Sequence, residues 1–149
     1  MKISTKGRYG TKALLDLALH HSEGPVPIRE IARRQGIPVH YLERLLTPLI
    51  SARLIGSVRG ARGGLKLLRY PKDIRLIDVV RLLEGPLSPV ECLNNPENCP
   101  RADTCVTRDV WEEVKKAIDS VLEATTLQDL VERQKKKEQA QPQKAMYFI

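Results

Sequence analysis

The segment from residue 28 to residue 68 holds the pattern that most narrows the possible folds of this chain. IREIARR (28–34) and PVHYLERLLTPLIS (38–51) each place apolar residues at helical spacing, and a short break separates them. Ala32 is small where two helices must approach closely, and Gly36 can adopt the positive φ of a tight turn. The leucines of the second segment are then expected to face the first. This spacing predicts a helix-turn-helix.

Two prolines mark the second of these helices. Pro38 suits the first turn of a helix, because its missing N–H would go unused there. Pro48 falls inside the helix, where proline removes one backbone hydrogen bond and crowds the preceding turn. We therefore expect the helix to kink or to end early at Pro48.

A Gly- and Arg-rich hairpin is predicted directly after the helix pair. RLIGSVRGARGGLKLLRYP contains two strand-like stretches, around 55–58 and 65–68. The turn between them carries Arg59 and Arg62 among glycines, on a thin finger that can enter a groove or grip phosphates. A helix-turn-helix followed by a hairpin is a winged helix. The expected fold class is therefore mainly α with a small β-hairpin wing.

Positive charge is concentrated in the same half of the chain. Residues 1–70 contain 13 Lys and Arg against 4 Asp and Glu, whereas residues 71–149 contain 12 against 14. A polyanion is the natural partner for so basic a segment, and nucleic acid is the usual polyanion. The alternative is a solvated basic face without a partner. The wing arginines favour double-stranded DNA.

The candidate DNA contacts lie on the second helix of the pair and on the wing. They are His40, Tyr41, Glu43, Arg44, Arg59 and Arg62. We expect the three arginines to make the main contacts. His40 can contact a phosphate or a base, or be an ordinary surface histidine. Tyr41 can stack on or hydrogen-bond the DNA backbone, or simply pack against the protein.

Glu43 is unusual on a helix that faces DNA, because its carboxylate repels phosphate. It can accept a hydrogen bond from a cytosine amino group, or discriminate against wrong sites. An ion pair along the helix is the alternative, and it is weak because neither position 46 nor position 47 holds Lys or Arg.

All three cysteines, Cys92, Cys99 and Cys105, fall in one short stretch, ECLNNPENCPRADTC. The Asn and Pro residues of this stretch exclude a continuous helix. Three cysteines in a polar loop are more typical of ligands than of core residues. Their spacing, C-x6-C-x5-C, is too long for the C-x2-C knuckles of a zinc ribbon. A thiol cluster without metal, or a zinc site of another kind, remains an alternative.

The cysteine count also indicates a compartment. An odd number of cysteines without a secretion signal favours a reducing environment, so we expect a cytoplasmic protein. No apolar run approaches the length that crosses a membrane.

Further helices are expected on both sides of the helix pair and the cysteine loop. Ser4 can cap a helix that ends near residue 21, and a shorter helix is expected over 76–83. Ser88 can start a single helical turn that ends at Cys92, with Pro89 at the first helical position.

A long amphipathic helix is expected over 107–124, followed by a last short helix capped by Thr126 and Asp129. Little of the chain is left to cover the apolar stripe of the long helix, so self-association is expected. Its members are Val110, Val114, Ala117, Ile118, Val121 and Leu122, with Trp111 beside them. ERQKKKEQAQPQK is expected to be a mobile charged segment, and the terminal AMYFI to dock on a partner subunit.

These elements divide the chain into three parts. We expect a winged helix-turn-helix over 1–84, a cysteine sensor loop over 85–106, and a dimerisation helix with a tail over 107–149. A loop that can hold a metal or cluster beside a DNA-binding module suggests a sensor.

Several motifs together indicate a family. They are KGRYG near the start, IREIA and YLERLL in the helix pair, RGARGG in the wing, EGPLSPVEC before the loop, and TTLQDL near the end. With them the chain resembles, over essentially its full length, the bacterial regulators that include the iron–sulfur cluster regulator (IscR), the nitric-oxide-sensing repressor (NsrR) and the cysteine-metabolism repressor (CymR). Any one motif alone would be weak.

The resemblance implies a homodimer with a winged helix and a long crossing dimerisation helix. Sensing members hold an iron–sulfur cluster on three loop cysteines, which correspond to Cys92, Cys99 and Cys105. We expect [2Fe–2S], with [4Fe–4S] as the alternative, since thiolates are the usual ligands of both. The start KISTKGRYG and the end YFI are closer to the CymR branch, whose members can lack the cluster cysteines and respond to a protein partner.

The fourth cluster ligand stays open. Some members of the family use a His three residues after the last cysteine, where this chain has Arg108, and others an acidic residue at the position of Arg8. Neither arginine can ligate. Other candidates are Asp109, Glu91, Asp103, a histidine of the other subunit and an exogenous thiol.

An enzyme is not expected. The sequence has no CxxC, no closely spaced Cys/His pair and no Gly-rich phosphate loop. The competing class is a cluster-free regulator controlled by a protein partner or by thiol oxidation. The operator, the regulated genes, activation against repression, and the direction of any cluster effect do not follow from the sequence.

Overall fold

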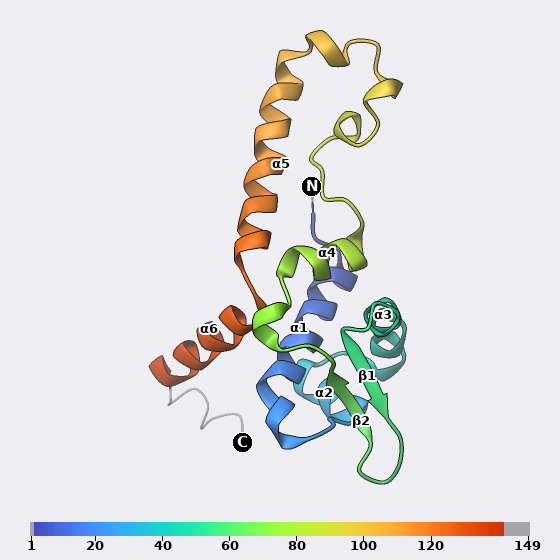
Figure 1. The fold of residues 1–149 in the computed structure, drawn as a ribbon, viewed down its shortest axis with the longest axis vertical. Helices are drawn as coiled ribbons and strands as arrows, with labels where there is room; N and C mark the ends of the chain where they lie inside the picture. Colours follow the sequence, from blue (N-terminus) through green and yellow to red (C-terminus); the bar gives the residue numbers. More distant parts are fainter. Residues whose placement is uncertain (1, 142–149) are drawn as a thin grey trace.

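The computed structural model describes residues 2–141 and confirms the predicted fold class (Figure 1). The described chain is mostly helical, with one two-stranded antiparallel sheet. Its elements are α1 (Thr5–His20), α2 (Ile28–Gln35), α3 (Val39–Ser51), β1 (Ile55–Val58), β2 (Gly64–Leu67), α4 (Leu76–Glu84), α5 (Val106–Ala124) and α6 (Leu127–Ala140).

Helix α1 begins at the predicted cap. The hydroxyl of Ser4 accepts a hydrogen bond from the Gly7 N–H at 3.3 Å. Ser4 in turn donates its own backbone N–H to the carboxylate of Glu84, at the end of α4, at 3.0 Å. The start of α1 and the end of α4 are therefore joined. A side chain at Gly7 would displace the carboxylate of Glu84 from its present position.

The helix-turn-helix forms as predicted. Helix α2 ends at Gly36, whose φ of 63° places it in the left-handed region that glycine tolerates. The N–H of Ile37 then donates to the Ala32 carbonyl at 3.0 Å and closes the turn. Leu42 and Leu45 of α3 are buried, as their expected orientation toward α2 requires.

The two prolines of α3 behave differently from expectation. Pro38 lies one residue before the helix, in extended conformation, instead of in its first turn. Pro48 lies inside α3, but the helix continues to Ser51, so the expected early end is wrong. The missing hydrogen bond is offset by packing, because Leu45, Leu46 and Leu49 are anchored in the core on both sides of Pro48.

The wing is a tight hairpin whose base is pinned by a third segment. Ile55 pairs with Leu67 and Val58 with Gly64, close to the predicted strands. Val26, in the linker before α2, exchanges backbone hydrogen bonds of 2.8 and 2.7 Å with Leu65 of β2. This bridge fixes the direction of the wing relative to the helix pair.

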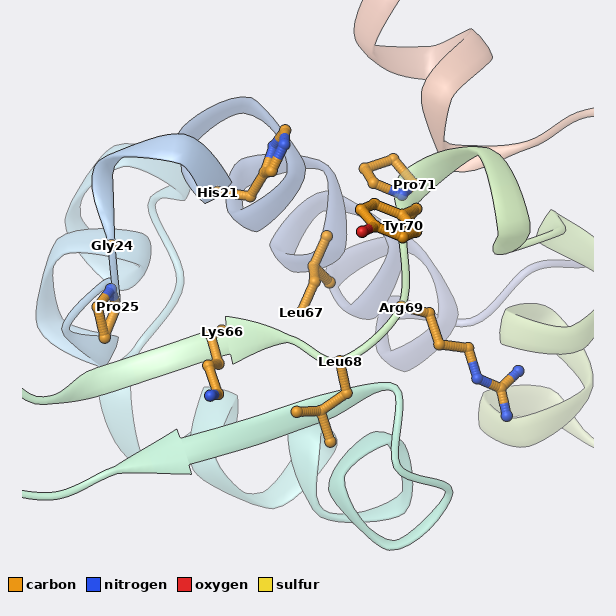
Figure 2. A pocket seen from close by; sticks show the side chains of 9 residues that line it. All are labelled: His21, Gly24, Pro25, Lys66, Leu67, Leu68, Arg69, Tyr70 and Pro71. Carbon is orange, nitrogen blue, oxygen red and sulfur yellow. The ribbon is translucent and has the colours of Figure 1, made fainter.

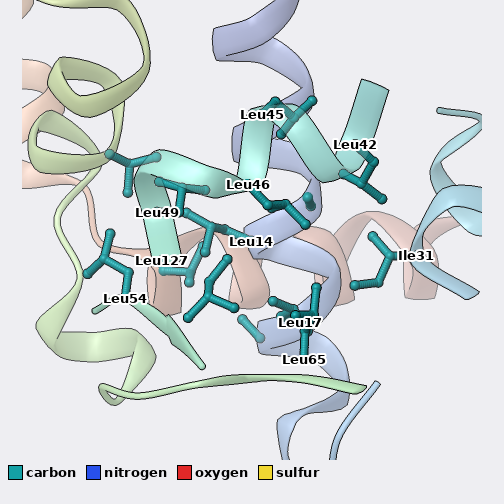
Figure 3. Packing of buried hydrophobic residues seen from close by; sticks show 14 of the residues in the cluster. Leu14, Leu17, Ile31, Leu42, Leu45, Leu46, Leu49, Leu54, Leu65 and Leu127 are labelled. Atoms are coloured by element: carbon teal, nitrogen blue, oxygen red, sulfur yellow. The ribbon is translucent and has the colours of Figure 1, made fainter. Parts of the chain in front are cut away.

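Leucine is the commonest residue in the core of the winged helix (Figure 3). Side chains from α1, α2, α3, the wing and α6 meet in one cluster, and burial of each large side chain stabilises the fold by about 1.5–3 kcal/mol. The cluster includes Leu14, Leu17, Ile31, Leu42, Leu45, Leu46, Leu49, Leu54, Leu65 and Leu127.

Helix α4 has the predicted bounds to within one residue. Its buried face, Ile77, Val79, Val80 and Leu83, packs chiefly on α1, α3 and α5. Helix α4 thus lies between the winged-helix module and α5, and its apolar residues, which recur at helical spacing, face the helices that cover them.

The cysteine loop consists of three successive 3-10 turns, Glu91–Leu93, Pro96–Asn98 and Ala102–Thr104. The predicted turn starting at Ser88 is wrong, since the first turn begins at Glu91 and the hydroxyl of Ser88 donates to the Val90 carbonyl instead. Cys92 therefore lies within a turn and not at its end.

Helix α6 is longer than expected. Its N-terminus has the predicted capping box, in which Thr126 and Asp129 exchange side-chain and backbone hydrogen bonds of 3.2 and 2.8 Å. Residues 132–140, expected to be mobile, continue the helix because they are good helix formers and carry polar pairs four residues apart, such as Gln134 and Glu138 at 2.9 Å.

The AMYFI segment lies outside the described residues. Within residues 2–141, none of the helices has the length and apolarity that spanning a membrane requires.

Candidate nucleic-acid interface and cysteine loop

Helix α3 separates a buried leucine face from an exposed polar face. His40, Glu43 and Arg44 all lie on the exposed face, and the His40 side chain is 98% exposed. This is the arrangement of a recognition helix, in which one face is anchored in the core and the other is open to a groove of DNA. We call α3 the recognition helix from here on.

Glu43 has a possible ionic partner three residues toward the N-terminus of the helix, although positions 46 and 47 on its C-terminal side hold no cation. The Nδ1 atom of His40, three residues earlier, lies 4.0 Å from Oε2 of Glu43. An ion pair along the helix is therefore present when His40 is protonated. Both groups are exposed, so this pair is weak and either side chain can turn to another partner.

Tyr41 packs against the protein. Its ring meets that of Tyr9 on α1 edge to face, with centroids 5.9 Å apart and an interplanar angle of 82°. Both tyrosines are half-buried and pack on the leucine core. Tyr41 therefore joins α1 to the recognition helix while part of its surface stays exposed.

The wing tip presents its two arginines to solvent. Arg59 and Arg62 are exposed, and within residues 2–141 neither has a carboxylate within 4.0 Å. The Gly63 N–H donates to the Gly60 carbonyl at 3.0 Å, and a side chain at Gly63 would lie 2.2 Å from the Val58 carbonyl oxygen. The glycines thus allow a tip narrow enough to enter a groove.

A buried carboxylate that we did not predict anchors the end of α2. Asp16 of α1 is 1% exposed. It accepts hydrogen bonds of 2.9 and 2.7 Å from Arg34 and one of 3.0 Å from Gln35, the two residues before Gly36. An Asp on the apolar face of a helix is the signal that could have indicated this contact.

The electrostatics of this cluster favour the charged form of Asp16. Burial raises the pKa of the carboxyl group, but the hydrogen bonds from Arg34 and Gln35 and the positive charge of Arg34 outweigh burial. The net effect is a pKa below the usual range for Asp.

The three cysteines each accompany one of the 3-10 turns. Cys92 lies within the first turn, Cys99 follows the second, and Cys105 follows the third and precedes α5. All three are free and half-buried. Among residues 2–141, however, no three Cys, His, Asp or Glu side chains lie together closely enough to hold a metal ion.

The thiol of Cys105 lies among hydrogen-bond donors at the start of α5. Its sulfur lies 3.2 Å from the Thr107 hydroxyl, and hydrogen bonds from that hydroxyl and from the Arg108 backbone N–H lower the pKa of the thiol. Arg108 itself has a buried Nε without a hydrogen-bond partner among the described residues. Arg108 also occupies the position, three residues after Cys105, at which the resemblance would place a histidine ligand.

The donor type suits an iron–sulfur cluster by chemistry, since thiolates are the usual ligands of such a cluster and this loop supplies three free thiols. A fourth ligand would have to come from another group.

Helix α5 extends away from the winged helix and has no buried residue (Figure 1). A largely apolar groove of about 540 Å³ runs along it, walled on the other side by the N-terminal residues and Leu87. Five of the six members of the predicted stripe lie in it, while Val110 and the neighbouring Trp111 are exposed. The groove is lined by Lys2, Ile3, Leu87, Val114, Ala117, Ile118, Val121 and Leu122.

A second hollow, of about 390 Å³, lies between the end of α1 and the wing (Figure 2). Leu67, Tyr70 and Pro71 form one side and His21 the other. The imidazole of His21 is tied to the Ala18 carbonyl at 2.7 Å. The predicted site residues lie elsewhere, so this hollow is not part of the candidate interface.

Comparison with known proteins identifies the family. The profile of the Rrf2 family, described as an iron-dependent transcriptional regulator, matches residues 3–133. The chain belongs to the Rrf2 family. The predicted resemblance is thereby confirmed, and so is the expectation of a transcriptional regulator in place of an enzyme, because the relatives are named as regulators.

Three Rrf2 relatives illustrate the range of similarity. Protein rrf2 of Nitratidesulfovibrio vulgaris is 48% identical over 131 residues, covering 88% of this chain and 87% of that protein. The regulator CymR of Bacillus subtilis is 45% identical over 130 residues, covering 87% and 89%. The structure of T. potens IscR has a TM-score of 0.75 at 45% identity, covering 95% of this chain and 91% of that one.

Proposed function

We propose that this Rrf2 regulator is a cytoplasmic homodimer that binds a pseudo-palindromic DNA operator. The observation that carries the proposal is the pairing of an exposed polar recognition helix with a wing tip of two exposed arginines. Both belong to the half of the chain that holds the positive excess. Arg44, Arg59 and Arg62 supply charge to phosphates or guanine edges.

The remaining candidate contacts take lesser roles. His40 and Glu43 stand at the exposed face as one weak pair, and DNA binding would separate or reorient them. A freed Glu43 carboxylate accepts from a cytosine amino group and disfavours other bases. Tyr41 packs on Tyr9 and presents its remaining surface to the DNA backbone.

The uncovered groove of α5 supports the dimer. An exposed apolar groove this large on a small protein indicates an interface, and a second copy of α5 offers the complementary apolar stripe. Two recognition helices would then lie about one helical turn of DNA, ~34 Å, apart.

We further propose that Cys92, Cys99 and Cys105 bind an iron–sulfur cluster whose state changes operator affinity. When bound, such a cluster supplies redox and ligand-exchange chemistry. The loop joins α4 to α5, and Asp119 of α5 links the two helices through Arg81 of α4 at 3.8 Å, while Lys115 of α5 holds the same carboxylate at 2.7 Å. Ordering of the loop can therefore alter the angle between the two DNA-binding heads. The fourth ligand is not assigned.

A cluster-free regulator, controlled by thiol oxidation or a protein partner, is the second candidate. Two observations favour it: no three donor side chains of residues 2–141 form a group that could hold a metal ion, and CymR is among the similar relatives. Under that alternative, the lowered pKa of the Cys105 thiol favours the thiolate form, which is the form that reacts with oxidants.

The DNA-binding proposal is tested by the salt dependence of operator affinity. The logarithm of affinity falls as the logarithm of salt concentration rises, and each phosphate contact that is lost makes this fall less steep by about 0.9. A substitution removes one contact from each of the two subunits of a dimer. Arg59→Ala and Arg62→Ala should each flatten the slope if they touch phosphate. Unchanged affinity and slope in both variants would remove the wing from the interface.

The cluster proposal is tested by anaerobic reconstitution of the wild type and of a variant with all three cysteines changed to Ala. We expect iron and sulfide uptake and a visible absorption spectrum only in the wild type, with an altered operator affinity. A colourless wild type, or identical DNA binding by the two proteins on every operator tried, would leave the cluster-free regulator as the better candidate.

A further inference from the structure

The first half of α1 carries three exposed cations, two of which, Arg8 and Lys12, lie one turn apart on the same face. Lys6, Arg8 and Lys12 are all exposed, and within the described residues none has a carboxylate within 4.0 Å. The cations of α2 differ, since Arg33 pairs with Glu30 at 2.7 Å and Arg34 with the buried Asp16. The charges on α1 are thus available to a partner.

Two of these cations gather around one aromatic ring. The guanidinium carbon of Arg8 lies 5.8 Å from the centroid of the Tyr9 ring, and Nζ of Lys12 lies 5.9 Å from it. Both distances fall in the range of cation–π attraction, which is worth about 0.5–1 kcal/mol at an exposed site. Tyr9 is itself anchored on the core, so the two flexible side chains are held near a fixed point.

This cluster stands beside the recognition helix. Tyr9 meets Tyr41 edge to face, and Tyr41 lies between His40 and Glu43 in the sequence of α3. The charges of Arg8 and Lys12 are therefore next to the end of α3 that carries most of the candidate DNA contacts. A recognition helix that enters the major groove brings its neighbours onto the flanking phosphate backbone.

The spacing of the two cations is unfavourable without a partner. Arg8 and Lys12 are four residues apart on one face of a helix, where like charges repel and destabilise the helix by a few tenths of a kcal/mol. A polyanion would remove that cost, because each cation would face a phosphate.

We propose that Arg8 and Lys12, held by Tyr9, form a second line of phosphate contacts that flanks the recognition helix. The inference rests on the proposed DNA-binding function and adds α1 to the interface. These contacts carry charge and no base-specific information, so they strengthen binding to every sequence and set the register of α3 on the duplex.

The test measures operator affinity as a function of salt concentration for Arg8→Ala and Lys12→Ala, with fluorescence anisotropy as the readout. Each substitution removes one cation from both subunits of the dimer, so the slope should fall by about 1.8. When the salt concentration rises fourfold, the ratio of wild-type affinity to variant affinity should therefore fall by about twelvefold. The ranking of operator sequences should not change. Arg8→Lys should retain most of the wild-type slope.

The matched control is Lys116→Ala, which removes the same charge from an exposed lysine near the middle of α5, the helix that extends away from the winged helix (Figure 1). Its slope should equal that of the wild type.

If the wing variants flatten the slope and the α1 variants do not, α1 is outside the interface while the DNA-binding function stands. If the α1 variants instead weaken the dimer in sedimentation with an unchanged slope, these cations form a subunit contact and the inference is wrong. A wild type without affinity for double-stranded DNA would overturn the proposed function itself.

Discussion

Asp16 illustrates how one buried charge can position a DNA-binding element. It reaches from the middle of α1 to the last two residues of α2, directly before the glycine turn that orients the recognition helix. Breaking a buried ion pair leaves an uncompensated charge, and that cost exceeds the gain from having made the pair. The cluster therefore acts more as a positional restraint than as a large source of stability.

We predict that Asp16→Asn destabilises the protein by about 2–3 kcal/mol. The Asn amide would present N–H groups to the Arg34 donors, although Arg34 can still reach water. The urea midpoint should fall with an unchanged m-value. Glu30→Gln is the control, because it alters only exposed pairs, with Arg33 at 2.7 Å and with the outer side of Arg34 at 3.6 Å, and it should stay within about 0.5 kcal/mol of the wild type. Equal midpoints for both variants would contradict a restraining role for Asp16.

The pH dependence of stability follows from the same carboxylate. Its pKa is lower in the folded protein than in the unfolded chain, where Asp titrates near about 3.9. The stabilisation is therefore fully present above about pH 5 and is lost as the pH falls through the folded pKa. The stability difference between wild type and Asp16→Asn should be constant near neutrality and shrink below about pH 4. A difference that stays constant down to about pH 2 would contradict this assignment.

The direction of the wing is not set by its hairpin turn alone. Its glycines allow the tight tip, but its base is held by the bridge between Val26 and Leu65. Gly64 faces that bridge, and a Cβ there would lie 2.4 Å from the Val26 carbonyl carbon. The backbone of the linker leaves no room for a side chain.

We predict that Gly64→Ala displaces the Val26 bridge and lowers stability by about 1–3 kcal/mol, through overpacking against backbone. Operator affinity should fall more than affinity for non-specific DNA, because the wing would lose its direction. Gly56→Ala is the control on the facing strand, since its Cβ would meet only the flexible side chain of Leu68, 2.8 Å away. Thermal melting and anisotropy measure the two effects, and similar losses in both variants would argue against the bridge as the determinant.

The molecule as a whole consists of a well-packed winged helix and a long helix that has no buried side chain of its own. Helix α5 is amphipathic, yet the described chain covers only one edge of its apolar stripe. An isolated helix of this kind gains little from propensity alone, and most helical stability comes from packing of the apolar face. The monomer is therefore an incomplete folding unit around α5.

We predict that Ile118→Asp gives monomers, because it places a charge in the apolar groove that the second subunit would cover. Operator affinity should fall to near the non-specific level, since two linked heads bind far better than one. Ser120→Asp is the control, as this exposed residue lies on another face of the same helix and should leave the dimer intact. Light scattering checks both, and a persistent Ile118→Asp dimer would place the interface elsewhere.

Several features of the protein follow from the sequence alone because they depend on residues a few positions apart. The Ser4 cap, the left-handed turn at Gly36, the glycine hairpin and the capping box of α6 are all local, so the residues themselves specify them. The helical spacing of the apolar residues likewise predicts α4 and α5 closely. The candidate DNA contacts and the cysteines were found in the same way, by residue type and position.

Other features were decided only by the tertiary structure. The pairs Asp16–Arg34, Val26–Leu65 and Ser4–Glu84 join residues 18 to 80 positions apart, and no local pattern specifies which of many possible partners is chosen. The course of α3 past Pro48 and the placement of Tyr9 against Tyr41 likewise depend on packing from other elements. The physical reason is that local preferences differ by about 1 kcal/mol or less for most residues, whereas burial of a leucine or pairing of a buried charge contributes more. Where the two conflict, the packed core determines the outcome.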